Sequence, residues 1–205
     1  MAAVQRGDAA EDDSKGHALM HDPTARAIQE RFIEYARDVT HLRDVLRHSS
    51  EAEHRALAAQ ILGYAADKAD VIGDLVYGMD DSSEAVRNNA MRALGVIAAA
   101  SPGQRLRIPI EPFIDLMNSP EWTDRNKASF ALVELSQSRN PQLLATLRSR
   151  AIVALVEMAR WKSRGHAMPA LMILGRIGGQ SDEEVEAAWE RGERESVINA
   201  ALSPR

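Results

Sequence analysis

The apolar residues of this 205-residue chain recur in steps of three and four. The clearest example is DDSSEAVRNNAMRALGVIA, residues 80–98, a polar turn followed by a segment with one apolar stripe. Steps of three and four place side chains on one face of an α-helix, whereas strands alternate with a period of two. We find no convincing run of alternating β-branched and aromatic residues that would mark a strand. The pattern therefore predicts an all-α protein.

One frame within this pattern, Arg-x-x-Ala-x-x-apolar-Leu, occurs four times. The copies begin at Arg55, Arg87, Arg125 and Arg164, so that successive arginines lie 32, 38 and 39 residues apart. A degenerate fifth copy begins at Arg194. Self-similarity at a period of 20–50 residues is typical of repeat architectures, in which each unit is one supersecondary element.

A second frame, apolar-x-x-apolar-apolar, alternates with the first. Its copies begin at Leu42, Ile72, Ile110, Ile152 and Val185. Both frames have the spacing of a helix with one buried stripe, and turn residues separate them. The alternation predicts helix pairs of about 30 to 40 residues that bury their apolar faces only by stacking on their neighbours.

The same patterns divide the chain into four parts. We expect a disordered N-terminal tail over 1–21, a capping helix over 22–38, the repeats over 39–178, and a degenerate C-terminal capping repeat over 179–205. The capping helix should start after Asp22 and pack a stripe that includes Ile28 and Tyr35 on the first repeat. The string SEAE that begins at Ser50 predicts a capping box at the next helix.

Residues 80–98 resemble the HEAT repeat, especially its bacterial HEAT-like variety. The resemblance rests on Asp81 in the turn, on Val86 and Arg87, and on Ala90 followed by the Ala-Leu-Gly run at 93–95. Other copies depart from the family pattern, with Val133 where glycine is usual and with Gly165 and Pro169 inside the fourth copy. The resemblance implies a right-handed α–α superhelix, a HEAT-like solenoid of four to five helix pairs behind an N-terminal helical cap. It implies little about function, because the same solenoid serves many roles.

No group of residues has the pattern of a catalytic, cofactor or metal site. The chain has no cysteine, which excludes disulfides, thiol catalysis and cysteine-based zinc sites. His17 and His21 have the spacing of metal ligands only on a formed helix, and they fall in the expected tail. The glycines of LGRIGGQS, residues 174–181, end a helix rather than cradle a phosphate. We therefore expect a protein that is not an enzyme and that uses no cofactor.

The charge is unevenly distributed around a net value of −5. Residues 120–176 hold nine basic and four acidic residues, between acidic ends. One alternative function is therefore nucleic-acid binding or base repair through the basic segment 120–164. The resemblance implies a second alternative, a role like that of bilin lyases. The first 20 residues lack the apolar core of a signal peptide, and no run reaches 18 apolar residues, so we expect a cytoplasmic protein without membrane insertion.

The resemblance also implies which side chains meet a partner. In HEAT proteins the second helix of each pair lines the concave face, so the positions one, two and five after each repeated arginine should point into the groove. These are Gln60, Asn88, Asn89, Arg92, Asn126, Lys127, Phe130 and His166. Amides and cations suit the backbone and acidic side chains of an extended peptide, and an exposed Phe130 would be an anchor.

The repeated arginines themselves have a different expected role. The resemblance implies a structural ladder of Arg55, Arg87, Arg125 and Arg164, in which each arginine binds an Asp-bearing turn such as that of Asp81. The sequence thus predicts a non-catalytic scaffold, adaptor or regulatory subunit that binds a protein or peptide on its concave face. It leaves the partner and the oligomeric state open.

Overall fold

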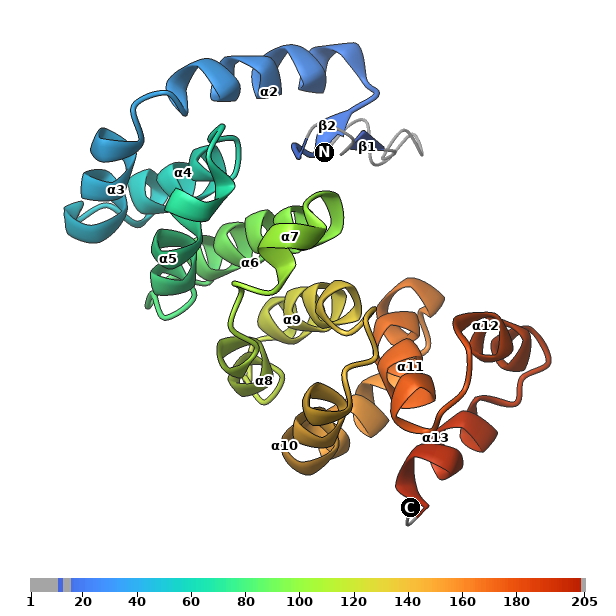
Figure 1. The fold of residues 1–205 in the computed structure, drawn as a ribbon. Helices are drawn as coiled ribbons and strands as arrows, with labels where there is room; N and C mark the ends of the chain where they lie inside the picture. Colours follow the sequence, from blue (N-terminus) through green and yellow to red (C-terminus); the bar gives the residue numbers. More distant parts are fainter. Residues whose placement is uncertain (1–10, 13–15, 204–205) are drawn as a thin grey trace. The chain divides into compact units, whose positions relative to one another are not determined.

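We describe the protein from a computed structural model, which describes residues 11–12 and 16–203. The chain forms two compact units, unit 1 up to Pro109 and unit 2 from Ile110 onward. Apart from one short hairpin, the regular elements of the described residues are helices (Figure 1). No helix among the described residues is both long and apolar enough to cross a membrane.

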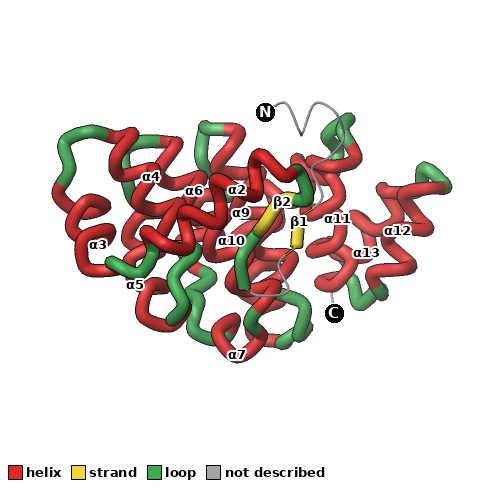
Figure 2. The backbone as a smooth tube through the Cα atoms, turned by 90° about the horizontal axis from the view of Figure 1, so that it is seen from above, coloured by secondary structure: helices red, strands yellow, loops and turns green. Residues whose placement is uncertain are grey.

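Unit 1 contains two helix pairs behind an N-terminal helix. The elements are β1 (Glu11–Asp12), β2 (Leu19–Met20), α2 (Pro23–Tyr35), α3 (Val39–His48), α4 (Ala52–Leu62), α5 (Lys68–Gly78), α6 (Glu84–Ala100) and the short α7 (Pro102–Arg105). Helices α3 and α4 form one pair and α5 and α6 the next, and the second helices α4 and α6 pack side by side. Strands β1 and β2 form an antiparallel hairpin in which Glu11 lies opposite Met20, and Figure 2 shows it beside α2.

Unit 2 contains three helix pairs. They are α8 (Glu111–Leu116) with α9 (Trp122–Leu135), α10 (Pro141–Ala159) with α11 (Arg164–Ile177), and α12 (Asp182–Glu190) with α13 (Arg194–Leu202). Helix α11 packs against both α9 and α13, so the second helices again stack on one another. The described residues therefore hold five helix pairs, which confirms the all-α HEAT-like solenoid of four to five pairs. We call the surface formed by the second helices of a unit its second-helix face.

The cores of both units are built from the two sequence frames. The alanine and the leucine of each first-frame copy are at most 2% exposed, from Ala58 and Leu62 in α4 to Ala167 and Leu171 in α11. Small residues at these positions let the second helices approach closely, and the leucines fill the space between the layers. In the second frame, Leu46, Leu75 and Leu155 are fully buried. The regular spacing in the sequence thus corresponds to a regular packing of helices.

Gly175 in α11 lies where another helix comes closest. A Cβ built on it would stand 2.1 Å from Cγ2 of Val185, a buried side chain of α12. We expect Gly175→Ala to destabilise the protein by about 2 kcal/mol, since an extra carbon in a filled core forces its neighbours to move. The matched control is Gly73→Ala in α5, where a Cβ meets nothing within 4 Å. There the change should stabilise by roughly 0.5 kcal/mol, because alanine loses less backbone entropy in a helix. Urea unfolding of the two variants measures both effects, and equal midpoints would contradict the expectation.

The N-terminal part differs from the sequence expectation. Residues 1–10 and 13–15 of the expected tail lie outside the described residues, but Gly16, Ala18 and Leu19 are buried in unit 1. The capping helix is present as α2, yet its apolar stripe is only partly covered: Phe32 packs edge-on against Tyr64, whereas Ile28 and Tyr35 are 53% and 51% exposed. The reason is that α2 packs mainly on β2, through its buried residue Gln29. A polar residue, which the stripe did not include, therefore fixes this helix.

Candidate functional site

The repeated arginines bind the turns and helices of adjoining repeats. Arg55 donates two hydrogen bonds to the carboxylate of Asp81, at 2.7 and 2.9 Å, and a third to the carbonyl of Ser49. Arg87 binds the carbonyls of Asp81 and Ser82 in the turn before its own helix. Asp81 thus joins two repeats, and the hydrogen bonds from Arg55 lower the pKa of its carboxyl group.

In unit 2 the corresponding arginines bind glutamates of the following first helix. Arg125 forms an ion pair with Glu157 at 2.8 Å and lies over the ring of Trp161. Arg164 pairs with Glu190 at 3.3 Å. These contacts place Arg125 and Arg164 between repeats, but their acidic partners are helix glutamates and not the Asp-bearing turns that the predicted ladder requires.

We expect Arg55→Ala to cost about 2 kcal/mol at neutral pH, because it removes charge-assisted hydrogen bonds from the nearly buried carboxylate of Asp81. The pKa of this carboxyl group is lower in the folded chain than in the unfolded chain. The stability that the Arg55–Asp81 interaction contributes is therefore present above the unfolded pKa of about 4. It is lost as the pH falls through the lowered pKa of the folded chain. Denaturant unfolding of both proteins at pH 7 and at decreasing acidic pH measures this. A difference between wild type and variant that stays constant down to pH 2 would contradict the assignment.

On the second-helix face of unit 1, the chain's own N-terminal segment packs around a small pocket, and its residue Ala18 forms one wall of that pocket. The pocket has a volume of about 30 Å³, and its lining comprises Ala18, Gln60, Gly63, Tyr64, Asn89, Arg92, Ala93 and Val96. Ala18 belongs to the N-terminal segment, whereas the other residues come from α4, α6 and the turn after α4. Three residues predicted to line the groove, Gln60, Asn89 and Arg92, are therefore brought together here.

Polar side chains hold this segment by its backbone. The amide of Gln29 donates to the carbonyl of Ala18 at 2.8 Å, and its oxygen accepts from the backbone N–H of Met20 at 2.7 Å. The hydroxyl of Tyr64 also donates to the carbonyl of Ala18, at 3.2 Å. Such contacts recognise an extended main chain whatever its side chains are.

Side chains of the segment make further contacts with the same face. Arg92 forms an ion pair with Glu11. The ring of His17 stacks on that of Tyr64, with the centroids 5.6 Å apart. The arrangement provides one cation for a carboxylate and one aromatic ring for a flat side chain.

Lys68 lies beneath the segment. Its ammonium group donates to the carbonyl of Gly63 at 2.7 Å and lies 3.2 Å from Nδ1 of His17. Because burial disfavours the charged form, the pKa of Lys68 falls from 10.5 to about 8. Burial and the nearby Lys68 also lower the pKa of His17. Nothing in the sequence singles out Lys68, since its burial depends on contacts with residues 16–18, a part of the expected tail.

The second-helix face of unit 2 has a larger, open groove. Its volume is about 590 Å³, and its lining comprises Phe130, Val133, Glu134, Arg164, Gly165, Met168, Pro169 and Met172. Phe130 is 47% exposed, so it is available to a partner. Two methionines, which adapt to different shapes, lie on the facing helix. Phe130 was predicted as an anchor, whereas the methionines were not selected because nothing in their spacing separates them from core residues.

The other residues predicted for the groove have different positions. Asn126 is only 7% exposed, so it cannot be a surface contact, because α9 turns this position into the helix stack. Asn89 lines the pocket but uses its amide to bind the carbonyl of Ala56 in α4, which links the two second helices. His166 packs edge-on against the ring of Trp122. Asn88 and Lys127 are partly exposed.

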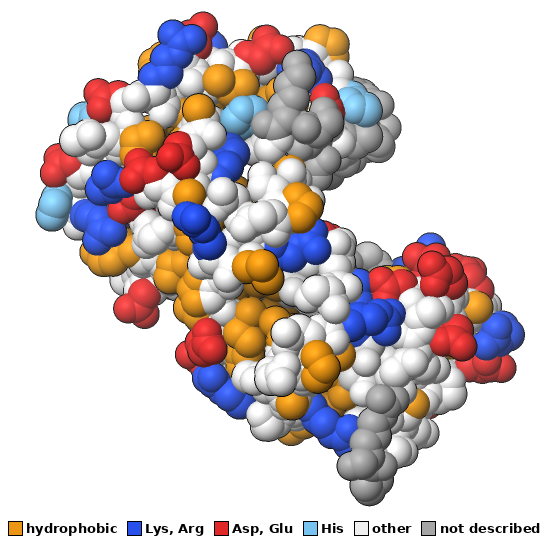
Figure 3. Space-filling view, viewed as in Figure 1, with side chains coloured by type: hydrophobic (Ala, Val, Ile, Leu, Met, Phe, Trp, Pro, Cys, Tyr) orange, Lys and Arg blue, Asp and Glu red, His pale blue; other side chains and the backbone are white. Residues whose placement is uncertain are grey.

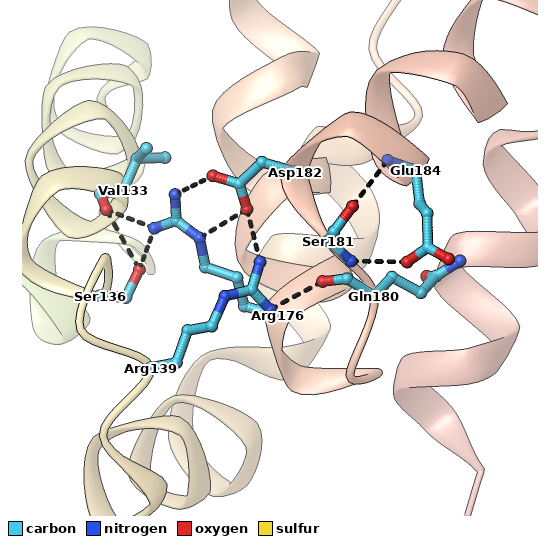
Figure 4. A network of polar contacts seen from close by, with 8 residues as sticks. All are labelled: Val133, Ser136, Arg139, Arg176, Gln180, Ser181, Asp182 and Glu184. Carbon is cyan, nitrogen blue, oxygen red and sulfur yellow. Dashed lines mark hydrogen bonds and ion pairs between the residues drawn. The ribbon is translucent and has the colours of Figure 1, made fainter.

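A buried arginine network in unit 2 was missed entirely. Arg176 in α11 donates to both carboxylate oxygens of Asp182, to the carbonyl of Val133 and to the hydroxyl of Ser136 (Figure 4). Arg139 reaches the same carboxylate from the other side, at 2.8 Å. The hydrogen bonds from Arg176 lower the pKa of Asp182. The network joins the three helix pairs of unit 2, through α9, α11 and α12, and we assign it a structural role.

The basic segment of the sequence is largely neutralised in the structure. Its arginines at 125, 160 and 164 each pair with a glutamate, and Arg160 forms two hydrogen bonds of 2.9 Å with Glu195. Figure 3 shows acidic side chains gathered over α12. Nucleic acid usually binds a surface of unpaired positive charge. These three arginines are already bound to carboxylates within the protein.

Comparisons with known proteins agree with this architecture. Residues 39–107 match the family model described as HEAT repeats. No curated protein sequence matches the chain.

Among solved structures, an engineered protein superposes with a TM-score of 0.62 at 18% identity, covering 89% of this chain and 90% of that one. A computationally designed armadillo repeat protein for modular peptide recognition gives 0.60 at 18%, covering 88% and 93%. A designed armadillo repeat protein in complex with the peptide (KR)4 gives 0.58 at 19%, covering 89% and 93%. At these identities the likeness shows the fold, a solenoid of the armadillo and HEAT type.

Proposed function

We propose that this chain, which carries HEAT repeats over residues 39–107, is a non-catalytic adaptor. It binds an extended segment of a partner protein on its second-helix face. The observation that carries this proposal is the docked N-terminal segment of unit 1, where Ala18 lies beside α4 and α6 and its carbonyl accepts a hydrogen bond from Tyr64. A surface that holds one extended segment through a backbone carbonyl has the groups needed to hold another.

The chemistry of the face favours an acidic peptide. Arg92 is the one charged residue among the eight that line the unit 1 pocket, and it already binds a carboxylate. One designed structural neighbour binds the basic peptide (KR)4. By contrast, Arg92 on unit 1 and Lys127 on unit 2 should each select against such a peptide and attract aspartate and glutamate.

The groove of unit 2 supports the same function by different means. It offers an exposed aromatic ring between apolar side chains, which suits a large apolar residue of the partner. Phe130 and the two methionines would supply most of the affinity, because buried apolar anchors dominate binding energies whereas surface charges chiefly steer association.

A selection of displayed peptides on the immobilised full chain tests the proposal. Selected peptides should be rich in acidic residues. Their affinity, measured by fluorescence anisotropy, should fall at least tenfold for Arg92→Glu when they bind unit 1 and for Lys127→Glu when they bind unit 2. The matched control is Arg150→Glu, the same reversal of charge on the first helix α10, which should leave the affinity within twofold. Selection of no peptide, or an equal loss in all three variants, would refute the proposal.

Nucleic-acid binding is not favoured by a specific observation, since arginines of the basic segment pair with glutamates. The same holds for a role like that of bilin lyases, for which no site stands out among the described residues. The peptide proposal is therefore the one we carry forward.

A further inference from the structure

The second-helix face of unit 1 is already covered in part by the N-terminal segment of the chain itself. The segment reaches the face through a hairpin, and Ala18 and Leu19 are 7% and 4% exposed. It makes contact through an ion pair, stacked rings and backbone hydrogen bonds, all of which an external peptide could make equally well.

The described contacts of this segment are of a kind that can be exchanged. Its carbonyl at Ala18 is bound by side chains of Gln29 and Tyr64, not by a backbone ladder from the helices. Strands β1 and β2 have two residues each. An isolated short hairpin has little stability of its own, so the docked state depends on the contacts with the helical face.

We propose that residues 11–12 and 16–20 are a built-in competitor that occupies the partner's site on unit 1 and must leave before the partner binds. This inference rests on the proposed function and specifies its ligand. The partner supplies an extended peptide with a carboxylate for Arg92, a flat side chain against Tyr64, and a small residue that fits the position of Ala18.

The geometry explains why such a competitor is effective. Met20 lies two residues before Asp22, which caps the N-terminus of α2. The segment is thus tethered directly beside its site, and a short tether corresponds to an effective concentration in the millimolar range. A partner in solution has to outcompete this concentration, so the intact chain should bind weakly until the segment is released.

Gly16 offers a way to weaken the segment without changing the face. Its φ is +73°, a region that side-chain-bearing residues rarely adopt, and a Cβ would stand 3.3 Å from Cε of Lys68. Gly16→Ala should therefore undock the segment and leave α4 and α6 intact. The matched control is Gly103→Ala, where a Cβ meets nothing within 4 Å.

The test uses a fluorescent synthetic peptide with the sequence of residues 9–22, added to the full chain. We expect Gly16→Ala to bind this peptide at least tenfold more tightly than wild type, and Gly103→Ala to bind like wild type. Hydrogen exchange at the amide of Met20, which wild type protects through Gln29, reports the release directly and should become faster only in Gly16→Ala. Circular dichroism checks that both variants retain their helices.

A charge exchange between peptide and protein tests the contact of Glu11 with Arg92. In the Gly16→Ala background, a peptide that carries Glu11→Arg should bind at least fivefold more weakly, and adding Arg92→Glu to the protein should restore its binding. Equal binding of the original peptide to wild type and Gly16→Ala would overturn the proposal, as would a charge exchange that restores nothing.

The two proposals fail in different ways. If the peptide of residues 9–22 binds neither protein while display-selected peptides still bind and are lost in Arg92→Glu, the competitor is refuted and the adaptor function stands. If no peptide of any kind binds, both are refuted.

Discussion

Replacing Arg176 by methionine should destabilise the protein by about 4 kcal/mol, the largest effect that we expect from a single side chain. The side chain of Arg176 is 3% exposed, and its partners include the hydroxyl of Ser136, which is fully buried. The carbonyl of Val133, near the end of α9, also depends on it. Methionine fills a similar volume but removes this donor, which leaves the carbonyl of Val133 with only the 3.3 Å bond from the hydroxyl of Ser136. Loss of a hydrogen bond to a buried polar group is costly.

Arg139 provides the matched control for this prediction. It binds the same carboxylate of Asp182, but its side chain is 37% exposed. Arg139→Met should therefore cost less than about 1 kcal/mol, as for most exposed ion pairs. Urea unfolding, followed by circular dichroism, separates the two cases. Equal losses in both variants would mean that the network acts only through the charge of Asp182.

Raising the pH from 8 to 10.5 should stabilise unit 1 by up to about 3 kcal/mol through Lys68 alone. Burial lowers the pKa of this lysine to about 8, whereas in the unfolded chain it is 10.5. Between these values the unfolded chain binds more protons than the folded chain, so stability rises with pH. The gain in stability from Lys68 is complete above pH 10.5. It is lost as the pH falls towards 8 and changes little below pH 8.

Lys68→Met isolates this effect from other groups that titrate in the same range. The free energy of unfolding of wild type, minus that of the variant, should rise by up to about 3 kcal/mol across the range. Parallel curves for the two proteins would show that Lys68 is not buried in the way described. Hydrogen exchange at the amide of Met20 should rise with pH less steeply than the intrinsic rate predicts, since residues 16–18 contribute to that burial.

The fold was largely predictable because it depends on a repeated local pattern. The first frame places Ala90 and Leu94, and their equivalents in the other repeats, on the buried side of each second helix. That information is carried by spacing alone. The repeated arginines were also interpretable, since Arg55 is matched by Asp81 in the following repeat.

Features that depend on contacts between distant residues were not predictable in the same way. Gln29 and Lys68 are polar residues on helical segments, and only the docked N-terminal segment makes them buried. Asn126 has the spacing of a groove residue, but the rotation of α9 buries it. The capping box expected at Ser50 is absent at α4, whose N-cap makes no side-chain bond, whereas Ser181 and Glu184 form one at α12.

The contact between Glu11 and Arg92 also constrains the order of folding. It joins residues 81 positions apart, whereas Arg55 and Asp81 are 26 apart. Contacts between distant positions close larger loops and form later. On the ribosome, Arg92 follows Glu11 by on the order of ten seconds, at about 5–20 residues per second. The first residues to be made must therefore wait for α6, and the N-terminal segment is the last part of unit 1 to reach its place.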